Sequence, residues 1–115
     1  MLLIKSITGI LLPAILLAGC SGRAGKTVPV KHLVEISQMR FQPAELSVHT
    51  GDTVQWINHD FVDHDITAET GKEWNSGRMA PGQSWQTEIK KEVRYYCSIH
   101  VVMKGKIVLI SGKPF

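Results

Sequence analysis

Three side chains that can bind a transition metal lie close together near the C-terminus: Cys97, His100 and Met103. Because consecutive members are three residues apart, a single loop between two strands can bring their thiolate, imidazole and thioether groups to one point. This combination of soft and borderline ligands suits copper. A structural zinc site has no need of a methionine. The spacing therefore predicts a copper site.

A fourth ligand must come from elsewhere in the chain, and His64 is the best placed. It follows the predicted strand 53–58 after a short loop and opens a second β-prone segment, 65–68. Two histidines and a cysteine with a weak axial methionine form the pattern typical of one-electron transfer at copper. Taken singly, Cys97 and Met103 would more often fill a core, but His100 between them makes that interpretation fail. The histidines at 32, 49 and 59 are interpreted as surface or strand-end residues.

The elements that must position these ligands are short strands. In segments 32–38, 45–49 and 53–58 apolar residues alternate with polar ones. Glycine, proline and charged turns separate the later β-prone segments, and no mature segment of ten residues has a helical period. This pattern predicts an antiparallel sandwich or barrel, with a tight hairpin at Thr50-Gly51-Asp52. Phe41, Trp56, Trp85 and Tyr96 are expected in the core, and Trp74 and Met79 either in the core or near the site. The expected strands are 32–38, 45–49, 53–58, 65–68, 84–89, 93–98 and 104–110.

A wider pattern of apolar, turn and ligand residues extends over about residues 31–111. Its members are Phe41, Pro43, Leu46, Val48, Gly51, Asp52, Val54, Trp56, Asn58, His64, Pro81, Gly82, Tyr96, Cys97, His100 and Met103. The pattern resembles the plastocyanin and amicyanin branch of the cupredoxins, and the short ligand loop is most similar to that of amicyanin.

This resemblance implies an all-β, Greek-key cupredoxin β-sandwich of about eight strands. It implies one type 1 copper ion near one end, held by the four residues above with Met103 axial. Hydrogen bonds between Asp65 and Ser98 would tie the two ligand loops together. The implied function is electron transfer with a redox partner protein, through His100 and a small apolar patch that includes Val101 and Val102, and not enzymatic catalysis.

Two positions depart from the family pattern. Val101 stands where related short loops often have a proline, so we expect His100 to be more mobile. Asp65 stands where the family commonly has asparagine, and its negative charge would favour Cu(II) over Cu(I).

The N-terminal segment predicts export and attachment to a membrane. Residues 1–19 have a lysine followed by an apolar run too short to span a bilayer, as in a signal peptide. The run ends in Leu-Ala-Gly-Cys, which resembles the bacterial lipoprotein box, so we expect lipidation of Cys20. Residues 20–30 form a tether and 31–115 the folded domain. The expected location is extracytoplasmic and periplasm-facing, as a membrane-anchored lipoprotein. Ordinary secretory cleavage near Ala18, with Cys20 left as a free thiol, is the alternative.

Composition and charge limit the remaining possibilities. The chain has 115 residues and a formal net charge of +3, which fits one domain and gives no basic patch for nucleic acid. We expect a monomer, and no motif for hydrolysis or group transfer stands out. The alternatives are a copper-handling protein that buffers or delivers the metal, and a copper-free interaction module. A disulfide between Cys97 and Cys20 is a further alternative, which lipidation of Cys20 would prevent.

Overall fold

The computed structural model describes residues 28–70 and 73–111, together with residues 3, 9–11, 13–16 and 19. Cys20 and residues 21–27 lie outside this part, so lipidation and the tether stay predictions. The described residues contain no helix of the length and apolarity that a membrane crossing requires.

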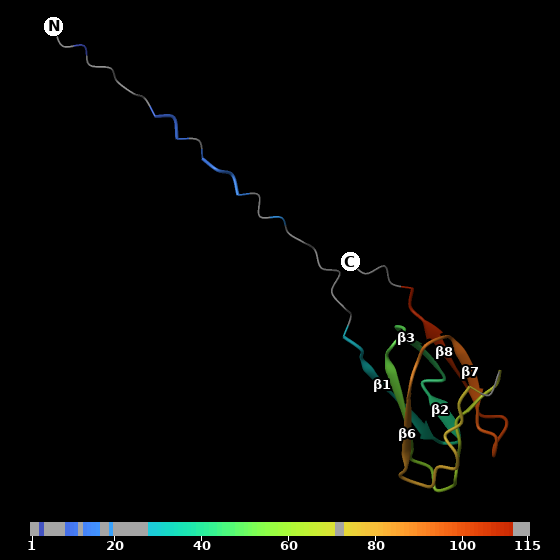
Figure 1. Cartoon of the computed structure of the whole chain (residues 1–115). Helices are drawn as coiled ribbons and strands as arrows, with labels where there is room; N and C mark the ends of the chain where they lie inside the picture. Colours follow the sequence, from blue (N-terminus) through green and yellow to red (C-terminus); the bar gives the residue numbers. More distant parts are fainter. Residues whose placement is uncertain are drawn as a thin grey trace.

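The strands in the described part of the chain form two sheets of four (Figure 1). The strands are β1 (Lys31–Ser37), β2 (Arg40–Gln42), β3 (Glu45–Val48), β4 (Thr53–Asn58), β5 (Thr67–Ala68), β6 (Ser84–Glu88), β7 (Val93–Tyr96) and β8 (Lys104–Leu109). One sheet has the order β2-β1-β4-β6 and the other β3-β8-β7-β5. The prediction of an all-β sandwich of about eight strands is confirmed.

The sheets are mixed, however, and not purely antiparallel as expected. β1 pairs in parallel with β4, and β3 pairs in parallel with β8, while the other pairs are antiparallel. Alternation of apolar residues reveals that a segment is a strand, but it carries no signal for the direction of a partner that is remote in sequence.

The predicted hairpin between segments 45–49 and 53–58 is wrong. β3 and β4 lie in different sheets, so the turn between them crosses from one sheet to the other. The turn chemistry itself was inferred correctly, because Gly51 has a φ of 94° and the Asp52 carboxylate accepts hydrogen bonds from the backbone N–H groups of His49 and Val30. A turn of this kind fits either connection.

The core between the sheets contains alternate residues of the long strands. In β1, Val34 and Ile36 are fully buried, and in β4 Val54 and Trp56 are fully buried. Phe41 is buried as expected, and Trp85 packs against the core while partly exposed. The prediction for Tyr96 is wrong by one residue, because Tyr95 is the buried member of the pair.

Two residues with open assignments, Trp74 and Met79, have distinct positions. The ring of Trp74 packs 5.7 Å from that of Trp56 and 5.5 Å from that of Trp85, so it belongs to the core. Met79 is also buried, but its backbone pairs with that of His64. It therefore lies beside the predicted metal site.

Candidate metal centre

His64 is held in place by a pair of backbone hydrogen bonds. Its N–H donates to the carbonyl of Met79 at 3.1 Å, and the Met79 N–H donates back at 2.8 Å. This isolated bridge joins the connection between β4 and β5 to the connection between β5 and β6, and the His64 side chain is fully buried. The backbone of His64 is therefore held in place, and its imidazole lies in the protein interior.

The other predicted ligands occupy the loop between the antiparallel strands β7 and β8. The Cys97 N–H donates to the carbonyl of Met103 at 3.1 Å, and the Met103 N–H donates to the carbonyl of His100 at 2.9 Å. Cys97 and Met103 are buried, whereas His100 is half-buried. This short closed loop directs a thiol and an imidazole toward His64.

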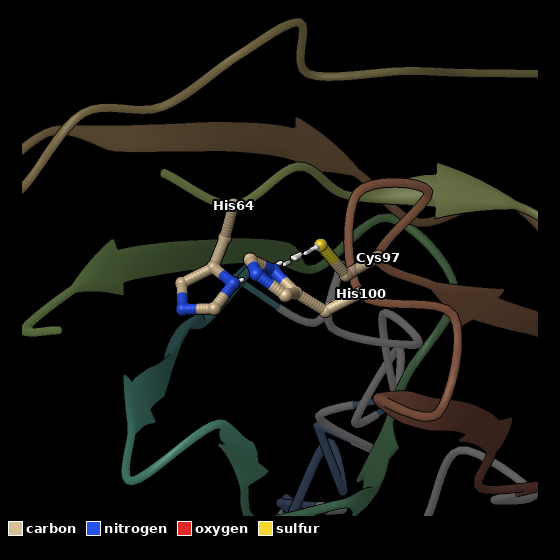
Figure 2. Close-up of side chains that lie close together, drawn as sticks. All are labelled: His64, Cys97 and His100. Atoms are coloured by element: carbon tan, nitrogen blue, oxygen red, sulfur yellow. Dashed lines mark hydrogen bonds between the residues drawn. The ribbon is translucent and has the colours of Figure 1, made fainter. Parts of the chain in front are cut away.

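Figure 2 shows that the side chains of His64, Cys97 and His100 converge. Cys97 Sγ lies 3.7 Å from His64 Nδ1 and 3.9 Å from His100 Nδ1. One donor atom from each of the three residues lies within 4.8 Å of the other two. Among the residues that the structure describes, this is the one cluster of three such ligand side chains.

These distances fit a bound transition-metal ion. With metal–sulfur and metal–nitrogen bonds of roughly 2.3 and 2.0 Å, the values for zinc, a trigonal arrangement separates the sulfur from each nitrogen by about 3.7 Å. The observed separations lie close to this value. The chemistry of the donor set, thiolate and two imidazoles with the thioether of Met103 in the same loop, fits type 1 copper.

Hydrogen bonds join the two segments that carry the ligands. The Asp65 carboxylate accepts from the Ser98 N–H at 2.6 Å and from the Ser98 hydroxyl, and it also accepts from Thr67 Oγ1 at 3.1 Å. The Asp65 N–H in turn points to Cys97 Sγ at 3.4 Å. Asp65 and Ser98 thus join the two segments directly beside the Cys97 thiol.

The sequence interpretation missed a contact of Asp60. Its Oδ2 lies 2.8 Å from His64 Nε2, the ring nitrogen that faces away from the thiol. Burial opposes ionisation of this carboxyl, but hydrogen bonds from His64 and from the backbone N–H groups of Met39 and Gln38 hold its pKa below the usual range. The sequence does place this carboxylate four residues before His64. Acidic residues are common in polar loops, however, so the spacing alone did not indicate a contact.

The three remaining histidines lie outside the site, as expected. His32 Nε2 and His49 Nδ1 face Asp52 at 2.8 and 3.9 Å, and His59 lies 3.6 Å from Glu35. None belongs to the group of converging donors.

Known proteins of similar sequence were found by comparison with this chain. A family model described as copper binding proteins, plastocyanin/azurin family, matches residues 28–110. Amicyanin of Paracoccus denitrificans is 29% identical, over 67% of this chain and 63% of its own length. Amicyanin-alpha of Methylorubrum extorquens is 27% identical, over 66% of this chain and 69% of its own length. The chain thus spans a little under two thirds of the Paracoccus relative.

Solved structures give the same result. A variant of amicyanin with Cu(I) superposes with a TM-score of 0.66 at 26% identity, over 76% of this chain and 89% of that one. A copper-containing nitrite reductase from Thermus scotoductus matches with a TM-score of 0.63 at 25% identity, over 75% of this chain but 23% of its own. The sequence match, the fold and the donor set agree, and the chain belongs to the plastocyanin/azurin family of copper binding proteins, the cupredoxins.

Proposed function

We propose that this protein is an electron carrier that uses one type 1 copper ion held by His64, Cys97, His100 and, axially, Met103. The observation that carries the proposal is the convergence of three donor atoms within 4.8 Å, with His64 and Cys97 fully buried. When bound, copper supplies a one-electron Cu(I)/Cu(II) couple.

The chain's own residues provide the conditions that such a couple needs. Backbone hydrogen bonds with Met79 and hydrogen bonds from Ser98 to the Asp65 carboxylate hold the segments that carry the ligands, so little rearrangement should accompany a change of charge at the metal. The burial of Cys97 excludes water from the thiolate. These features suit repeated transfer of an electron better than release of a metal.

The ligand loop also presents an apolar surface. Val101 is 62% exposed and Val102 86% exposed, directly after the half-buried His100. A small apolar patch of this kind allows a redox partner to dock and leave quickly. We propose that electrons pass through His100 and that the protein does not itself catalyse a reaction. The nitrite reductase resembles this chain over a minor part of its own length.

The deciding experiment is the visible and electron paramagnetic resonance spectrum of the full-length protein after addition of Cu(II), with Cys97→Ser as the matched variant. We expect an intense thiolate-to-copper band and narrow copper hyperfine splitting, both lost in the variant because serine supplies no thiolate. A colourless wild-type protein would exclude type 1 copper and favour a copper-free interaction module.

A second measurement separates an electron carrier from a copper-delivery protein of the same fold. An electron carrier keeps its copper through repeated cycles of chemical reduction and reoxidation in the presence of a competing Cu(I) chelator. Loss of the metal to the chelator within one cycle would instead support delivery.

We further propose that the protein is anchored outside the cytoplasm through a lipid on Cys20. The support is the sequence of the N-terminal segment alone. Mass spectrometry of the mature N-terminus tests the proposal, since a lipidated cysteine adds the mass of its acyl chains and an unmodified Cys20 would contradict it.

A further inference from the structure

The carboxylate of Asp60 connects His64, a predicted copper ligand, to the turn between β1 and β2. It accepts a hydrogen bond from His64 Nε2 at 2.8 Å. It also accepts from the backbone N–H groups of Gln38 and Met39, at 2.8 and 3.0 Å, in the turn between β1 and β2. The Asp60 side chain is 15% exposed and His64 is fully buried, so the contact is well shielded from solvent.

This contact determines which nitrogen of His64 is available to a metal. An ionised carboxylate can only accept hydrogen bonds, so the hydrogen lies on Nε2 of the imidazole. In the neutral ring the lone pair then lies on Nδ1, the nitrogen 3.7 Å from Cys97 Sγ. Asp60 therefore selects the tautomer that copper requires.

The turn that holds Asp60 is itself unusual. Gln38 and Met39 have φ values of 54° and 60°. Residues other than glycine and asparagine rarely adopt this left-handed backbone conformation. Strained conformations of this kind persist where the surroundings hold them, and here both N–H groups of the turn donate to one carboxylate.

A further hydrogen bond fixes Asp60 from its own loop. Its N–H donates to Asn58 Oδ1 at 2.9 Å, and the Asn58 amide donates to the carbonyls of Val62 and Met79. The carboxylate is thus oriented by groups that do not themselves contact the predicted metal.

We propose that Asp60 is the positioning residue of the copper site: its negative charge and geometry hold His64 as an Nδ1 ligand and shift the site toward Cu(II). This inference rests on the proposed ligation by His64. It predicts that loss of the charge lowers Cu(II) affinity more than Cu(I) affinity.

The test is Asp60→Asn in the full-length, copper-loaded protein. Removal of a hydrogen-bond partner behind a ligand typically lowers metal affinity about 10- to 100-fold. Because Cu(II) carries the larger charge, we expect its affinity to fall about tenfold more than that of Cu(I). A tenfold difference raises a one-electron reduction potential by about 59 mV. Spectroelectrochemistry measures this shift.

Asp63→Asn is the matched control. It removes the same charge from the same loop, but Asp63 forms an ion pair with Arg78 on the surface, at 3.2 Å. We expect the ratio of the Cu(II) and Cu(I) affinities of Asp63→Asn to change by no more than twofold. Its reduction potential should therefore stay close to that of the wild-type protein. An equal shift in both variants would show that net charge acts at a distance, and it would overturn the positioning role.

A second variant separates the site from the strained turn. Glycine adopts positive φ freely, so a Gln38→Gly, Met39→Gly protein has less need of the Asp60 carboxylate to hold the turn. In this background Asp60→Asn should still raise the potential. In addition, ¹⁵N spectra of the diamagnetic Cu(I) form should show weaker hydrogen bonding at His64 Nε2. If the potential and the His64 signals match those of the glycine parent, Asp60 serves the turn alone and the inference is wrong.

These outcomes are distinct from failure of the proposed function. If the wild-type protein shows no thiolate-to-copper band, the ligation itself is wrong and the inference falls with it. If the band is present and Asp60→Asn leaves the potential unchanged, only the inference about Asp60 is wrong.

Discussion

The residues beside His100 give the site its access to other proteins. Val102 is 86% exposed, although it lies in the same loop as the buried Cys97 and Met103. If electrons pass through His100, two copies of the protein must meet at this loop to exchange an electron. An aspartate at position 102 would then lose its hydration or face the aspartate of the other copy. We therefore expect Val102→Asp to slow electron self-exchange between the Cu(I) and Cu(II) forms at least tenfold, about 1.4 kcal/mol. Nuclear magnetic resonance line broadening measures that rate.

Val28→Asp is the control for this prediction. Val28 is 81% exposed and precedes β1, so the substitution changes the net charge equally without touching the ligand loop. We expect its self-exchange rate to stay close to that of the wild-type protein. Equal slowing in both variants would assign the effect to overall charge, and no slowing in Val102→Asp would exclude this surface as the route.

The sequence revealed the candidate ligands but not the residue behind them. Cys97, His100 and Met103 are recognisable because three ligand types recur at a short spacing, and His64 because it follows a strand. Asp60 could not be assigned in the same way, since its contact depends on how the loop after β4 folds back onto the turn between β1 and β2. Local spacing contains no information on that approach.

At the scale of elements, the pair of β7 and β8 supports the ligand loop. Tyr95 lies opposite Gly105, and a Cβ atom added to Gly105 would lie 2.1 Å from Cζ of the Tyr95 ring. Burial also raises the pKa of Tyr95 to about 12, so the ring stays neutral in the core. The absence of a side chain at Gly105 therefore lets the Tyr95 ring lie against β8, two residues before Cys97.

We expect Gly105→Ala to destabilise the protein by about 1–3 kcal/mol, because an extra methyl group in a packed core displaces its neighbours. Urea unfolding of the metal-free protein measures the loss, and the copper spectrum should broaden as Cys97 shifts. Lys106→Ala, at the next position of β8, should change stability by no more than about 0.5 kcal/mol. Equal stability of Gly105→Ala and the wild type would mean that Tyr95 moves aside freely.

Element prediction from the sequence succeeded for strands and failed for their partners. Strands 53–58 and 104–110 agree closely with β4 and β8. Val54 and Trp56 are spaced two apart in the first segment, and the second ends in a run of β-prone apolar residues. The three-residue strand β2 was missed, since so short a segment shows no period. The false hairpin around Gly51 arose because turn residues specify a bend but not which sheet the chain joins next.

At the scale of the whole molecule, two carboxylates that each accept three hydrogen bonds, Asp52 and Asp60, lie at opposite ends of β1. Asp60 holds the turn that follows β1, whereas Asp52 accepts hydrogen bonds from Val30 at its start and from His32 and His49. Burial opposes ionisation of Asp52, but these hydrogen bonds outweigh it and lower its pKa from 3.8 to about 2. One end of the strand thus serves the metal site and the other serves stability.

The lowered pKa gives Asp52 a defined dependence on pH. A depressed folded-state pKa contributes stability that is fully present above the unfolded value of 3.8 and is lost as the pH falls toward about 2. The contribution at neutral pH is about 2 kcal/mol. We expect Asp52→Asn to lower the unfolding free energy of the metal-free protein by that amount at neutral pH and by much less near pH 2.

Because the predicted metal site lies at the other end of β1, the copper spectrum of Asp52→Asn should stay unchanged. Asp63→Asn, which removes an exposed ion pair, should cost at most about 1 kcal/mol at neutral pH. A difference between Asp52→Asn and the wild type that does not shrink in acid would show that the hydrogen bonds of Asp52 do not depend on its charge.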